Sequence, residues 1–375
     1  MHVGVLVNTI ESPESIRTAG GNVHAIEVAK RWRGVDVTFF GPEFARRSLT
    51  AGGNHFQSLP SCEPWAKNRA VVFLFRSLAS LTNLRRLRSC DILYSTSHFL
   101  PDVLPAILAR FRRSAVCVHH IISHPRERRG SGSINSIAYM AERLSLFLIR
   151  VGMRHIIAGS RQAADILKDM GFRQPITITT NGVDHILELP AASGRSGALY
   201  VGRLHPSKCV DDLLRAWQLV VAERPDEKLV IVGQGDIGYT QYLRTLADEL
   251  GLQQHVVWAG PLSDGGRSAA LFSAKVFVFA SVEEGWGIAI AEAMSAALPC
   301  VTYDLPVFRG IFVKGRVSVP IGDIGSFARG TLELFNDPIY WSRLSEEALT
   351  LSHEFSWQRA ADIERQVLQR TFEMS

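Results

Sequence analysis

The chain has few cysteines, and no spacing pattern connects them. Its 375 residues include five cysteines, and no two of them form a C-x-x-C pair. An odd number of cysteines without disulfide or zinc-ligand spacing is typical of reduced thiols in the cytosol. We therefore expect neither a disulfide framework nor a cysteine-bound zinc.

Long apolar runs are also missing. No stretch approaches the roughly 20 apolar residues of a membrane-spanning helix. The N-terminal MHVGVLV begins like a strand and lacks the basic and apolar regions of a signal peptide, so we expect no export and a cytoplasmic protein. Hydrophobic residues make up 46% of the chain and charged residues 21%, which is typical of a globular protein, here long enough for two domains.

Charge is distributed unevenly. Residues 1–185 hold 24 basic and 13 acidic residues, whereas residues 186–375 hold 17 and 23. The basic first half contains three clusters of arginines. Clusters of this kind suit an anionic surface, either a membrane leaflet or a nucleic acid, and solvated helix ends are the plain alternative. We favour the cytoplasmic face of a membrane and no nucleic acid, because no aromatic-basic interleaving occurs. The clusters are Arg85, Arg86 and Arg88; Arg110, Arg112 and Arg113; and Arg126, Arg128 and Arg129.

Short apolar runs alternate with segments of helical period along the whole chain. This alternation predicts parallel sheets covered on both faces by helices. A small and polar stretch, Leu189–Gly197, separates two such sets and reads as a linker. The prediction is an α/β protein with two doubly wound, Rossmann-like domains facing a cleft, in which ligands bind beyond the carboxyl ends of the strands. The expected strands are Val3–Val7, Val35–Phe40, Ile92–Tyr94, Ala115–Val118, His155–Ala158, Ile176–Thr179, Ala198–Val201, Leu229–Val232, Val256–Trp258, Val276–Phe279 and Cys300–Thr302.

Two carboxylates lie close together after one expected strand. Glu284 precedes Gly-Trp-Gly, and Glu292 lies about a turn into the expected helix Ile288–Ala297. Gly285 and Gly287 would let the backbone approach a ligand at the helix N-terminus, where free amides favour phosphate. Both carboxylates can then face one polyhydroxylated ligand; a helix-capping acid and a solvated glutamate are the alternative.

Two cations flank another strand-to-helix turn. Arg203 follows the strand Ala198–Val201, and Lys208 precedes a helix expected to begin near Val210. Fixed cations at a helix start can neutralise a diphosphate leaving group without a metal. Two ordinary surface charges are the alternative.

Further candidates come from the first half of the chain. Gly20 and Gly21 open a helix and could contact a phosphate, unless they form a flexible loop capped by Asn22. His119 and His120 end a strand, where an imidazole can bind a sugar hydroxyl or exchange a proton. His124 lies further out on a polar loop, and no cysteine or carboxylate stands at metal-ligand spacing, so we expect no metal.

Ser97 and His98 close another strand, with a turn as the alternative. Together with His120, they are candidates for contact with an acceptor.

A literal G-x-G-x-x-G occurs at Gly233, Gly235 and Gly238. The next strand ends at Gly260 without an acid for a ribose hydroxyl, so this motif predicts a loop rather than a dehydrogenase site.

Taken together, the motifs resemble the retaining, nucleotide-sugar-dependent glycosyltransferases of the GT-B fold, family four, also called group 1. The matching segments follow one another along nearly the whole chain. They are the Gly20-Gly21 loop, VHH at 118–120, AGS at 158–160, TNGVD at 180–184, VGRL to Lys208 at 201–208, LVIVGQG at 229–235, EEGWGIAIAEAM at 283–294 and the closing EFSWQRAADIERQVLQR at 354–370.

The resemblance implies an organisation and a set of roles. It implies an acceptor-binding domain at 1–187, a donor-binding domain at 188–353, and a final helix at 354–375 that returns to the first domain. Arg203 and Lys208 would bind the donor diphosphate, Glu292 the ribose and Glu284 the sugar. The remaining donor contacts would come from Gly20, Gly21, Gly233, Gly260, Gly285, Trp286, Gly287 and Ile288, with His119 near the reacting face of the sugar.

The chain departs from the family pattern at two positions. Cys209 and Ala297 stand where the family usually has glycine.

The expected reaction moves a hexosyl group from a nucleotide diphosphate sugar to a hydroxyl acceptor with retention, in polysaccharide, glycolipid or lipid-linked oligosaccharide synthesis, and without any cofactor. A sugar-nucleotide epimerase, or a binder that transfers nothing, is the alternative. The apolar-basic stretches Val71–Leu81 and Leu144–Arg154 suit a lipid-linked acceptor at a membrane, although core helices with basic ends would have the same pattern. Nucleobase, sugar and acceptor are not encoded in these motifs.

Overall fold

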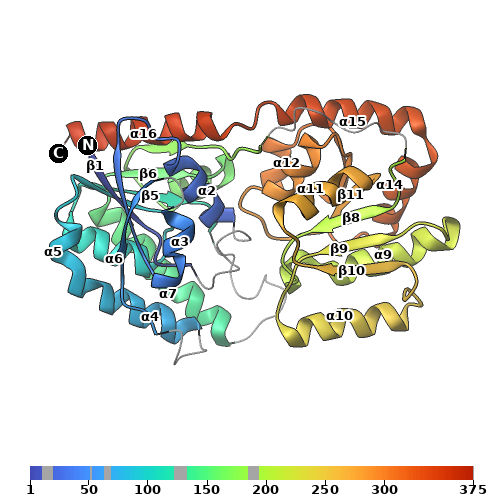
Figure 1. The fold of residues 1–375 in the computed structure, drawn as a ribbon, viewed down its shortest axis with the longest axis horizontal. Coiled ribbons are helices and arrows are strands. Elements are labelled where there is room, and N and C mark those ends of the chain that lie inside the picture. Colours follow the sequence, from blue (N-terminus) through green and yellow to red (C-terminus); the bar gives the residue numbers. More distant parts are fainter. Residues whose placement is uncertain (11–19, 51–52, 63–68, 122–132, 185–193, 375) are drawn as a thin grey trace. The chain divides into compact units, whose positions relative to one another are not determined.

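Two compact units make up the protein (Figure 1). The computed structural model describes residues 1–10, 20–50, 53–62, 69–121, 133–184 and 194–374. Unit 1 comprises Met1–Gly182 and Trp357–Ser375, and unit 2 comprises Val183–Ser356. The expected boundary at residue 187, part of the expected linker, His124 and the cluster Arg126 to Arg129 lie outside the described residues.

Unit 1 is built on a parallel sheet of seven strands in the order β3-β2-β1-β4-β5-β6-β7. Apolar side chains fill its central strands, as a sheet covered on both faces requires. This architecture confirms the prediction of a doubly wound domain. The strands are β1 His2–Leu6, β2 Asp36–Gly41, β3 His55–Ser58, β4 Ile92–Ser95, β5 Ser114–Val118, β6 His155–Ala158 and β7 Ile176–Ile178.

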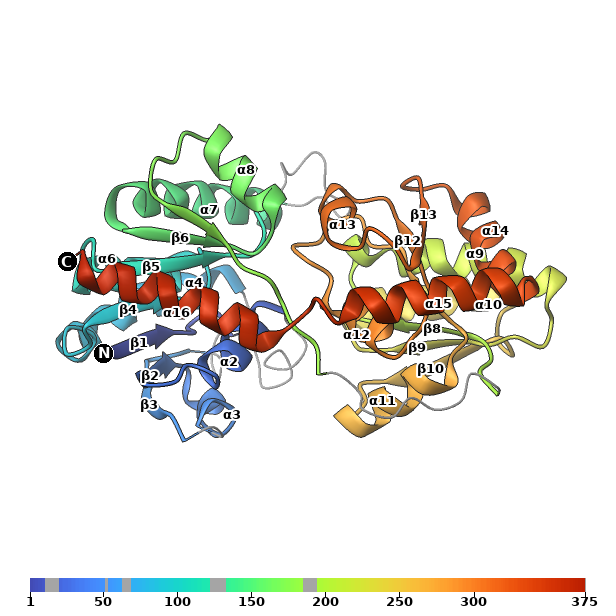
Figure 2. The ribbon, with the colours of Figure 1, turned by 90° about the horizontal axis from the view of Figure 1, so that it is seen from above.

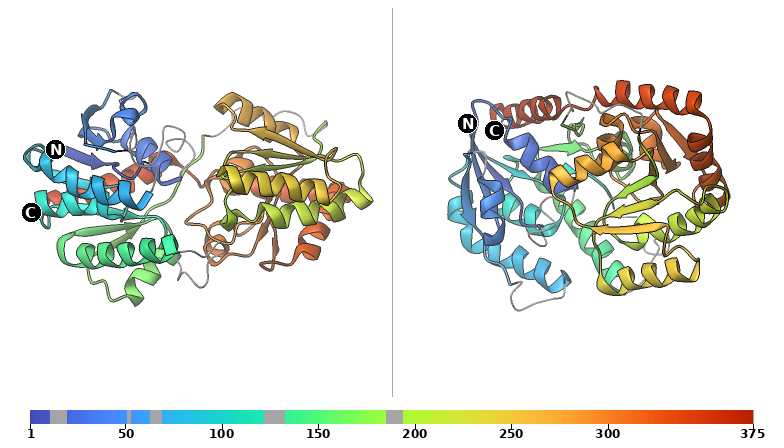
Figure 3. Two further views of the ribbon diagram at one scale, coloured as in Figure 1. Left: turned by 90° about the horizontal axis from the view of Figure 1, so that it is seen from below. Right: turned by 45° about the vertical axis from the view of Figure 1, so that its right-hand side comes forward.

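Helices cover both faces of this sheet. The C-terminal helix α16, Trp357–Glu373, contacts α2 and strands β4 to β6 on one face, as Figure 2 shows. On the other face α6 contacts β4 and β5 and lies against α4 and α7 (Figure 3, left). The final helix thus belongs to unit 1, in agreement with the predicted returning helix. The other helices are α2 Gly20–Ala29, η1 Glu43–Ala45, α3 Arg46–Leu49, α4 Arg69–Ala79, η2 Ser80–Asn83, α5 Leu84–Leu87, α6 Leu100–Ala109, α7 Ser133–Gly152 and α8 Arg161–Asp169.

Unit 2 repeats the design with a parallel sheet of six strands in the order β10-β9-β8-β11-β12-β13. Its strand order reverses at β8, the first strand of the unit: β9 and β10 follow on one side of β8, and β11, β12 and β13 follow on the other. Every residue of β11 is buried, so this strand needs apolar side chains on both faces. The strands are β8 Ala198–Val201, β9 Leu229–Val232, β10 Val256–Gly260, β11 Val276–Phe279, β12 Cys300–Tyr303 and β13 Arg316–Val319.

Two pairs of helices pack on the sheet of unit 2. Helix α14 lies against α9, and α12 lies against α15; Figure 1 draws α9 and α10 on one face and α11 and α12 on the other. The helices are η4 Pro206–Lys208, α9 Val210–Glu223, α10 Ile237–Glu249, α11 Asp264–Ser273, α12 Ile288–Ser295, α13 Pro306–Ile311, α14 Ile324–Asn336 and α15 Pro338–Ser352.

The two departures from the family pattern have a common backbone feature. Cys209 and Ala297 both have positive φ, at 48° and 54°. A Cβ is disfavoured in this left-handed conformation, which explains why glycine is usual at these positions. The chain therefore carries local strain at the turn after Lys208 and at the end of α12.

Replacing Ala297 by glycine should relieve that strain and raise the free energy of unfolding of unit 2 by about 1 kcal/mol. The neighbour Ala296, at φ −88°, is a matched control. Ala296→Gly should lower the free energy by about 0.5–1 kcal/mol, because glycine there adds only unfolded-state freedom. Urea denaturation compares the two variants, and equal destabilisation by both would contradict the assignment of strain to Ala297.

Candidate functional site

The loops after β8 and β11 meet at the point where the strand order of unit 2 reverses. Val282 donates its backbone N–H to the carbonyl of Ser207 at 2.9 Å. The buried hydroxyl of Ser281 donates to the same carbonyl at 3.2 Å. Ligands of open α/β sheets bind at such a reversal, beyond the carboxyl ends of the strands.

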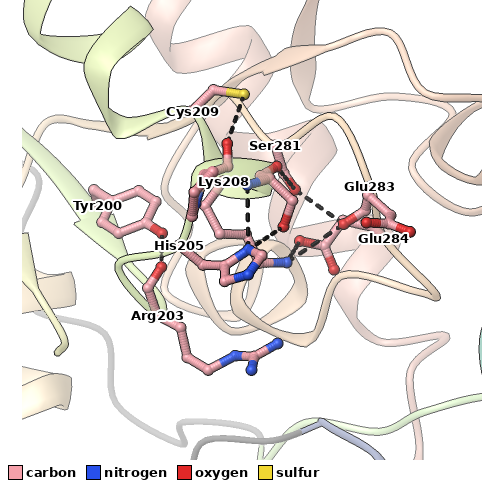
Figure 4. A network of polar contacts seen from close by, with 10 residues as sticks. Tyr200, Arg203, His205, Lys208, Cys209, Ser281, Glu283 and Glu284 are labelled. Carbon is pink, nitrogen blue, oxygen red and sulfur yellow. Dashed lines mark hydrogen bonds and ion pairs between the residues drawn. The ribbon is translucent and has the colours of Figure 1, made fainter. Parts of the chain in front are cut away.

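This junction brings together two residues that are 76 positions apart in the chain, Lys208 and Glu284. The Lys208 ammonium is hydrogen-bonded to Glu284 Oε1 and lies 3.4 Å from the carbonyl of Glu283 (Figure 4). Both side chains are 13% exposed. A nearly enclosed pair of this kind holds each charge in a fixed place, because losing one partner would leave the other uncompensated. A fixed cation beside a fixed hydrogen-bond acceptor can thus meet one ligand.

Arg203 comes from the same loop but does not converge with Lys208. The Arg203 side chain is exposed, and Figure 4 shows its guanidinium pointing away from the Lys208–Glu284 pair. Its backbone carbonyl accepts a hydrogen bond from the buried Tyr200 hydroxyl at 2.9 Å, which anchors the loop. The expected convergence of two cations is therefore not present in the structure, and a role of Arg203 at the diphosphate stays a prediction.

The glycines of the G-x-G-x-x-G motif let two loops touch. A Cβ on Gly233, which has φ +140°, would lie 1.8 Å from the carbonyl oxygen of Gly202. A Cβ on Gly235 would lie 1.9 Å from the carbonyl oxygen of Leu204. The motif therefore supports the backbone on either side of Arg203.

Gly260 contributes a hydrogen-bond acceptor to this arrangement. It accepts a hydrogen bond from the N–H of Gly233 at 2.9 Å. Contact of Gly233 or Gly260 with a donor stays a prediction.

Trp286 lies in the core of unit 2. Its ring is 7% exposed and packs edge-on against Phe312 and Phe355, with centroids 5.5 and 5.0 Å away. The indole therefore anchors the loop instead of offering a surface to a ligand, and only the backbone of Trp286 remains for the predicted donor contact. Gly287 follows at φ +107° as the N-cap of α12.

The first turn of α12 presents the remaining predicted groups. Its unpaired N–H groups begin at Ile288, next to Gly285 and the Lys208–Glu284 pair. Glu292 lies one turn later, with Oε1 3.3 Å from Arg267 Nη2 and its side chain 23% exposed. Burial raises the pKa of Glu292, and the attraction of Arg267 opposes that shift. Phosphate-binding amides and a hydroxyl-binding carboxylate can therefore serve one ligand here.

In unit 1, His119 follows β5 directly and is enclosed by glycines. A Cβ on Gly21 would lie 3.1 Å from His119 Cδ2, and one on Gly159 would lie 3.0 Å from the Cα of His119. The glycines of the expected GG and AGS motifs thus fit the histidine closely. Helix α2 begins at Gly20, so the alternative of an N-cap at Asn22 is wrong.

The candidates after β4 have internal partners. Ser97 donates to Asp102 Oδ2 at 2.6 Å, and the buried His98 has its Nε2 2.7 Å from Glu142 Oε1. These contacts favour a structural role for both residues over direct contact with an acceptor. His120 is partly exposed at the end of β5, and its role as an acceptor contact stays a prediction.

One potential metal cluster occurs within the described part of the chain, formed by His24, Cys117 and His119. Their ligand atoms lie within 4.8 Å of one another. Both ring nitrogens of His24 already contact oxygen atoms, and burial raises the pKa of the Cys117 thiol well above its usual range. A metal needs a free imidazole nitrogen and a thiolate, so these groups do not fit one.

Sequence reasoning missed two residues of these sites. Arg267, the partner of Glu292, lies on an exposed helix without a distinguishing signal. Glu364 on α16 did have a signal, because it interrupts the buried stripe of Ala360, Ala361, Val367 and Leu368 at helical spacing.

The whole chain shares its fold with solved structures. The chain superposes on sucrose-phosphate synthase from Thermosynechococcus elongatus with a TM-score of 0.82 and 15% identity over 100% of both chains. It superposes on HepE of Anabaena, solved with UDP and glucose, with a TM-score of 0.77 and 16% identity over 98% of both chains. The fold is that of the GT-B enzymes.

Part of the chain also matches a known family at the level of sequence. Residues 188–350 match the family model described as glycosyl transferases group 1, which confirms the predicted resemblance for this part of the chain. Phosphatidyl-myo-inositol mannosyltransferase of Mycobacterium leprae is 32% identical over 183 residues, 47% of this chain and 48% of the relative. The putative glycosyltransferase EpsD of Bacillus subtilis is 31% identical over 166 residues, 44% and 42% of the two chains. The chain spans about half the length of these curated relatives.

Replacing Gly233 by alanine should lower the free energy of unfolding of unit 2 by more than about 3 kcal/mol, because the Cβ collides with backbone at positive φ. Gly238→Ala is the matched control in the same motif, since its Cβ would meet only Asp236 Oδ1 at 3.2 Å. This control should change the free energy by less than about 1 kcal/mol. Equal tolerance of both changes in thermal melts would contradict the close approach of the two loops.

Proposed function

We propose that the protein is a retaining glycosyltransferase that moves a hexosyl group from a nucleotide diphosphate sugar to a hydroxyl acceptor. The observation that supports this most is the Lys208–Glu284 pair at the strand-order reversal of unit 2, beside the N-terminus of α12. It combines a cation and free amides for a diphosphate with carboxylates for hydroxyl groups. HepE was solved with UDP, and the M. leprae relative is named a mannosyltransferase, which supports a donor of this class.

The proposed chemistry is front-face displacement. The bond between the anomeric carbon and the diphosphate oxygen breaks, and the acceptor oxygen forms a bond to that carbon on the same face. The departing diphosphate oxygen takes the acceptor proton, so no protein nucleophile is required. Lys208 and the amides of α12 stabilise the negative charge on the leaving group. Glu284 and Glu292 accept hydrogen bonds from sugar and ribose hydroxyls, and no metal is needed.

Lys208→Ala should reduce turnover by roughly 10²–10³-fold, because it removes the fixed cation from the leaving group. The measurement is release of nucleoside diphosphate in the presence of acceptor, with and without a chelator. Lys228→Ala is the control, since Lys228 is exposed and precedes β9 at the opposite end of the sheet.

Two results would contradict the proposal. One is full turnover in Lys208→Ala. The other is conversion of the nucleotide sugar without any acceptor, which is the behaviour of an epimerase.

An exposed apolar face on unit 1 supports an acceptor at a membrane. Helices α4, α6 and α7 are neighbours on one face of the sheet, as Figure 3 shows from below. Side chains that would normally be buried stand out from them, including Leu74 at 62%, Leu78 at 57%, Met140 at 66% and Phe147 at 63% exposure. Core helices with basic ends, the alternative, would bury these side chains.

Positive charge borders this apolar face. At the end of α6, Arg88 donates a hydrogen bond to the carbonyl of Leu108, and Arg110 donates one to the carbonyl of Arg88. Phe111, which follows Arg110, is 57% exposed. Arg150 is exposed on α7, next in sequence to Val151, which is 49% exposed. Apolar side chains bordered by arginines match the interface of an anionic bilayer. We therefore propose that this face rests on the cytoplasmic surface of a membrane during synthesis of a glycolipid or lipid-linked glycan. Among the described helices, none is both long and apolar enough to cross a bilayer.

The double variant Leu74→Glu with Phe147→Glu should weaken binding to vesicles containing one third phosphatidylglycerol by roughly 100-fold, since two apolar side chains no longer enter the bilayer. Vesicle co-sedimentation measures the binding. Ile339→Glu, at an 84% exposed position on unit 2, is the control and should bind as the wild type does. Unchanged vesicle binding by the double variant would contradict the proposal. So would a wild-type protein that forms a dimer through this face instead of binding vesicles, if the double variant is a monomer.

A further inference from the structure

A carboxylate of the C-terminal helix is fully buried beneath the sheet end that carries His119. Glu364 of α16 is 0% exposed. Its Oε1 lies 2.6 Å from Nε2 of His24, and its Oε2 accepts the hydroxyl of Tyr94 at 2.7 Å. Both oxygens therefore have donors from unit 1, one from α2 and one from β4. A buried carboxylate needs such compensation, because removing a charge from water is costly.

His24 has oxygen atoms at both ring nitrogens. Nε2 faces Glu364, and Nδ1 lies 2.8 Å from Oδ1 of Asn181. An imidazole that donates from both nitrogens carries a positive charge. Burial alone would lower the pKa of His24, but the attraction of Glu364 and the hydrogen bonds from Glu364 and Asn181 outweigh it and raise the pKa. The oxygen atoms at both ring nitrogens therefore favour the imidazolium form of His24 beside the carboxylate of Glu364.

His119 lies against the ring of His24, and its pKa is shifted in the opposite direction. The two ring centroids are 4.8 Å apart, with planes at 72°. Burial lowers the pKa of His119 well below its usual range, interactions with His24 and His98 lower it further, and a hydrogen bond to the backbone of Thr96 opposes the shift. Its Nε2 has no hydrogen-bond partner among the described residues, and its Nδ1 is 3.8 Å from the thiol of Cys117. The contact with His24 and the lowered pKa therefore favour a neutral His119 whose buried Nε2 is without a hydrogen-bond partner.

We propose that Glu364 is a positioning residue for His119: it keeps His24 charged and in place, and the charged His24 keeps His119 neutral, with Nε2 able to accept a hydrogen bond from a sugar hydroxyl. A neutral residue pair could attach α16 to unit 1 without the cost of burying two charges. The charged pair instead sets the protonation state of a neighbouring ring. The protonation states hold whatever the protein catalyses, and only the contact with sugar rests on the proposed function.

Nitrogen NMR of ¹⁵N-histidine-labelled protein tests the charge states directly in the wild type. At pH 7, His24 should show two protonated ring nitrogens and His119 one. Assignment comes from the signals lost in His24→Asn and His119→Asn. A neutral His24 at pH 7 would overturn the proposal without any reference to activity.

Glu364→Gln tests the coupling. Removal of the carboxylate should move the titration of His24 to lower pH, so that it is neutral at pH 7, and the titration of His119 to higher pH. Tyr94→Phe is the matched control, because it removes the other hydrogen bond to Glu364 but leaves the charge, and His24 should stay protonated. An unchanged His119 titration in Glu364→Gln, once His24 is neutral, would overturn the coupling.

The pH dependence of thermal stability gives a second test of the charged His24–Glu364 pair. Because the folded pKa of His24 lies above the unfolded value near 6.5, the pair stabilises fully below about pH 6.5 and its contribution is lost as pH rises through the folded value. The wild-type Tm should therefore fall relative to that of Glu364→Gln as the pH rises above about 6.5. Parallel curves for the two proteins would contradict a charged His24–Glu364 pair.

Activity separates this inference from the proposed function. With a nucleotide sugar and an acceptor, Glu364→Gln should lower kcat at least tenfold with little change in the donor KM, and shift the acidic limb of the pH profile upward. If the NMR results agree with the predicted protonation states but the wild type transfers no sugar, the coupling of Glu364, His24 and His119 stands and the proposed function fails.

Discussion

A single carbonyl oxygen, that of Ser207, holds the candidate donor site together. It accepts the N–H of Val282 and the hydroxyl of Ser281, which joins the loop after β8 to the loop after β11. Only this junction brings Lys208 and Glu284, distant in the chain, within hydrogen-bonding distance. The parallel sheet makes the junction necessary, because the ends of β8 and β11 are neighbours and their connections leave in opposite directions. Charge placement in unit 2 thus follows from strand order.

The surroundings of this junction stiffen it. Gly233 and Gly235 let the loop after β9 press on the backbone at Gly202 and Leu204, and Trp286 fastens the loop before α12 to the core. The donor-side groups are therefore mounted on backbone that is supported from two sides. Preorganised groups of this kind lower the cost of stabilising charge as it develops. In unit 1 the same principle applies to His119, which glycines enclose and His24 contacts.

Much of this could be predicted from the sequence, for physical reasons. Buried strands such as Val276–Phe279 are continuous apolar runs, so their positions were predicted almost to the residue. The edge strands β3 and β13 were missed, because edge strands are partly exposed and their sequences, HFQS and RVSV, mix polar and apolar residues. The contact of Lys208 with Glu284 was not predicted, because it depends on the order of the strands in the sheet, and the sequence analysis expected Lys208 to converge with Arg203.

Side-chain direction was harder to predict. Trp286 stands between glycines like a ligand platform, yet its partners Phe312 and Phe355 come from later segments that local pattern does not reveal. Arg203 turns away from Lys208 because nothing in a loop sequence fixes a long exposed side chain. Glu364 depends on a contact with a residue 340 positions earlier, and only its place in an apolar stripe indicated burial.

Binding of a nucleoside diphosphate by unit 2 is the claim on which the proposed function depends most. Thermal melting of the full chain with millimolar ADP, GDP, UDP, CDP and dTDP, each without added metal, measures it directly, because a ligand that binds only the folded state raises Tm. At least one of the five should raise Tm by several degrees, and its nucleoside monophosphate should raise it less. No shift with any diphosphate, or an equal shift with the monophosphate, would contradict a diphosphate site at Lys208 and the N-terminus of α12.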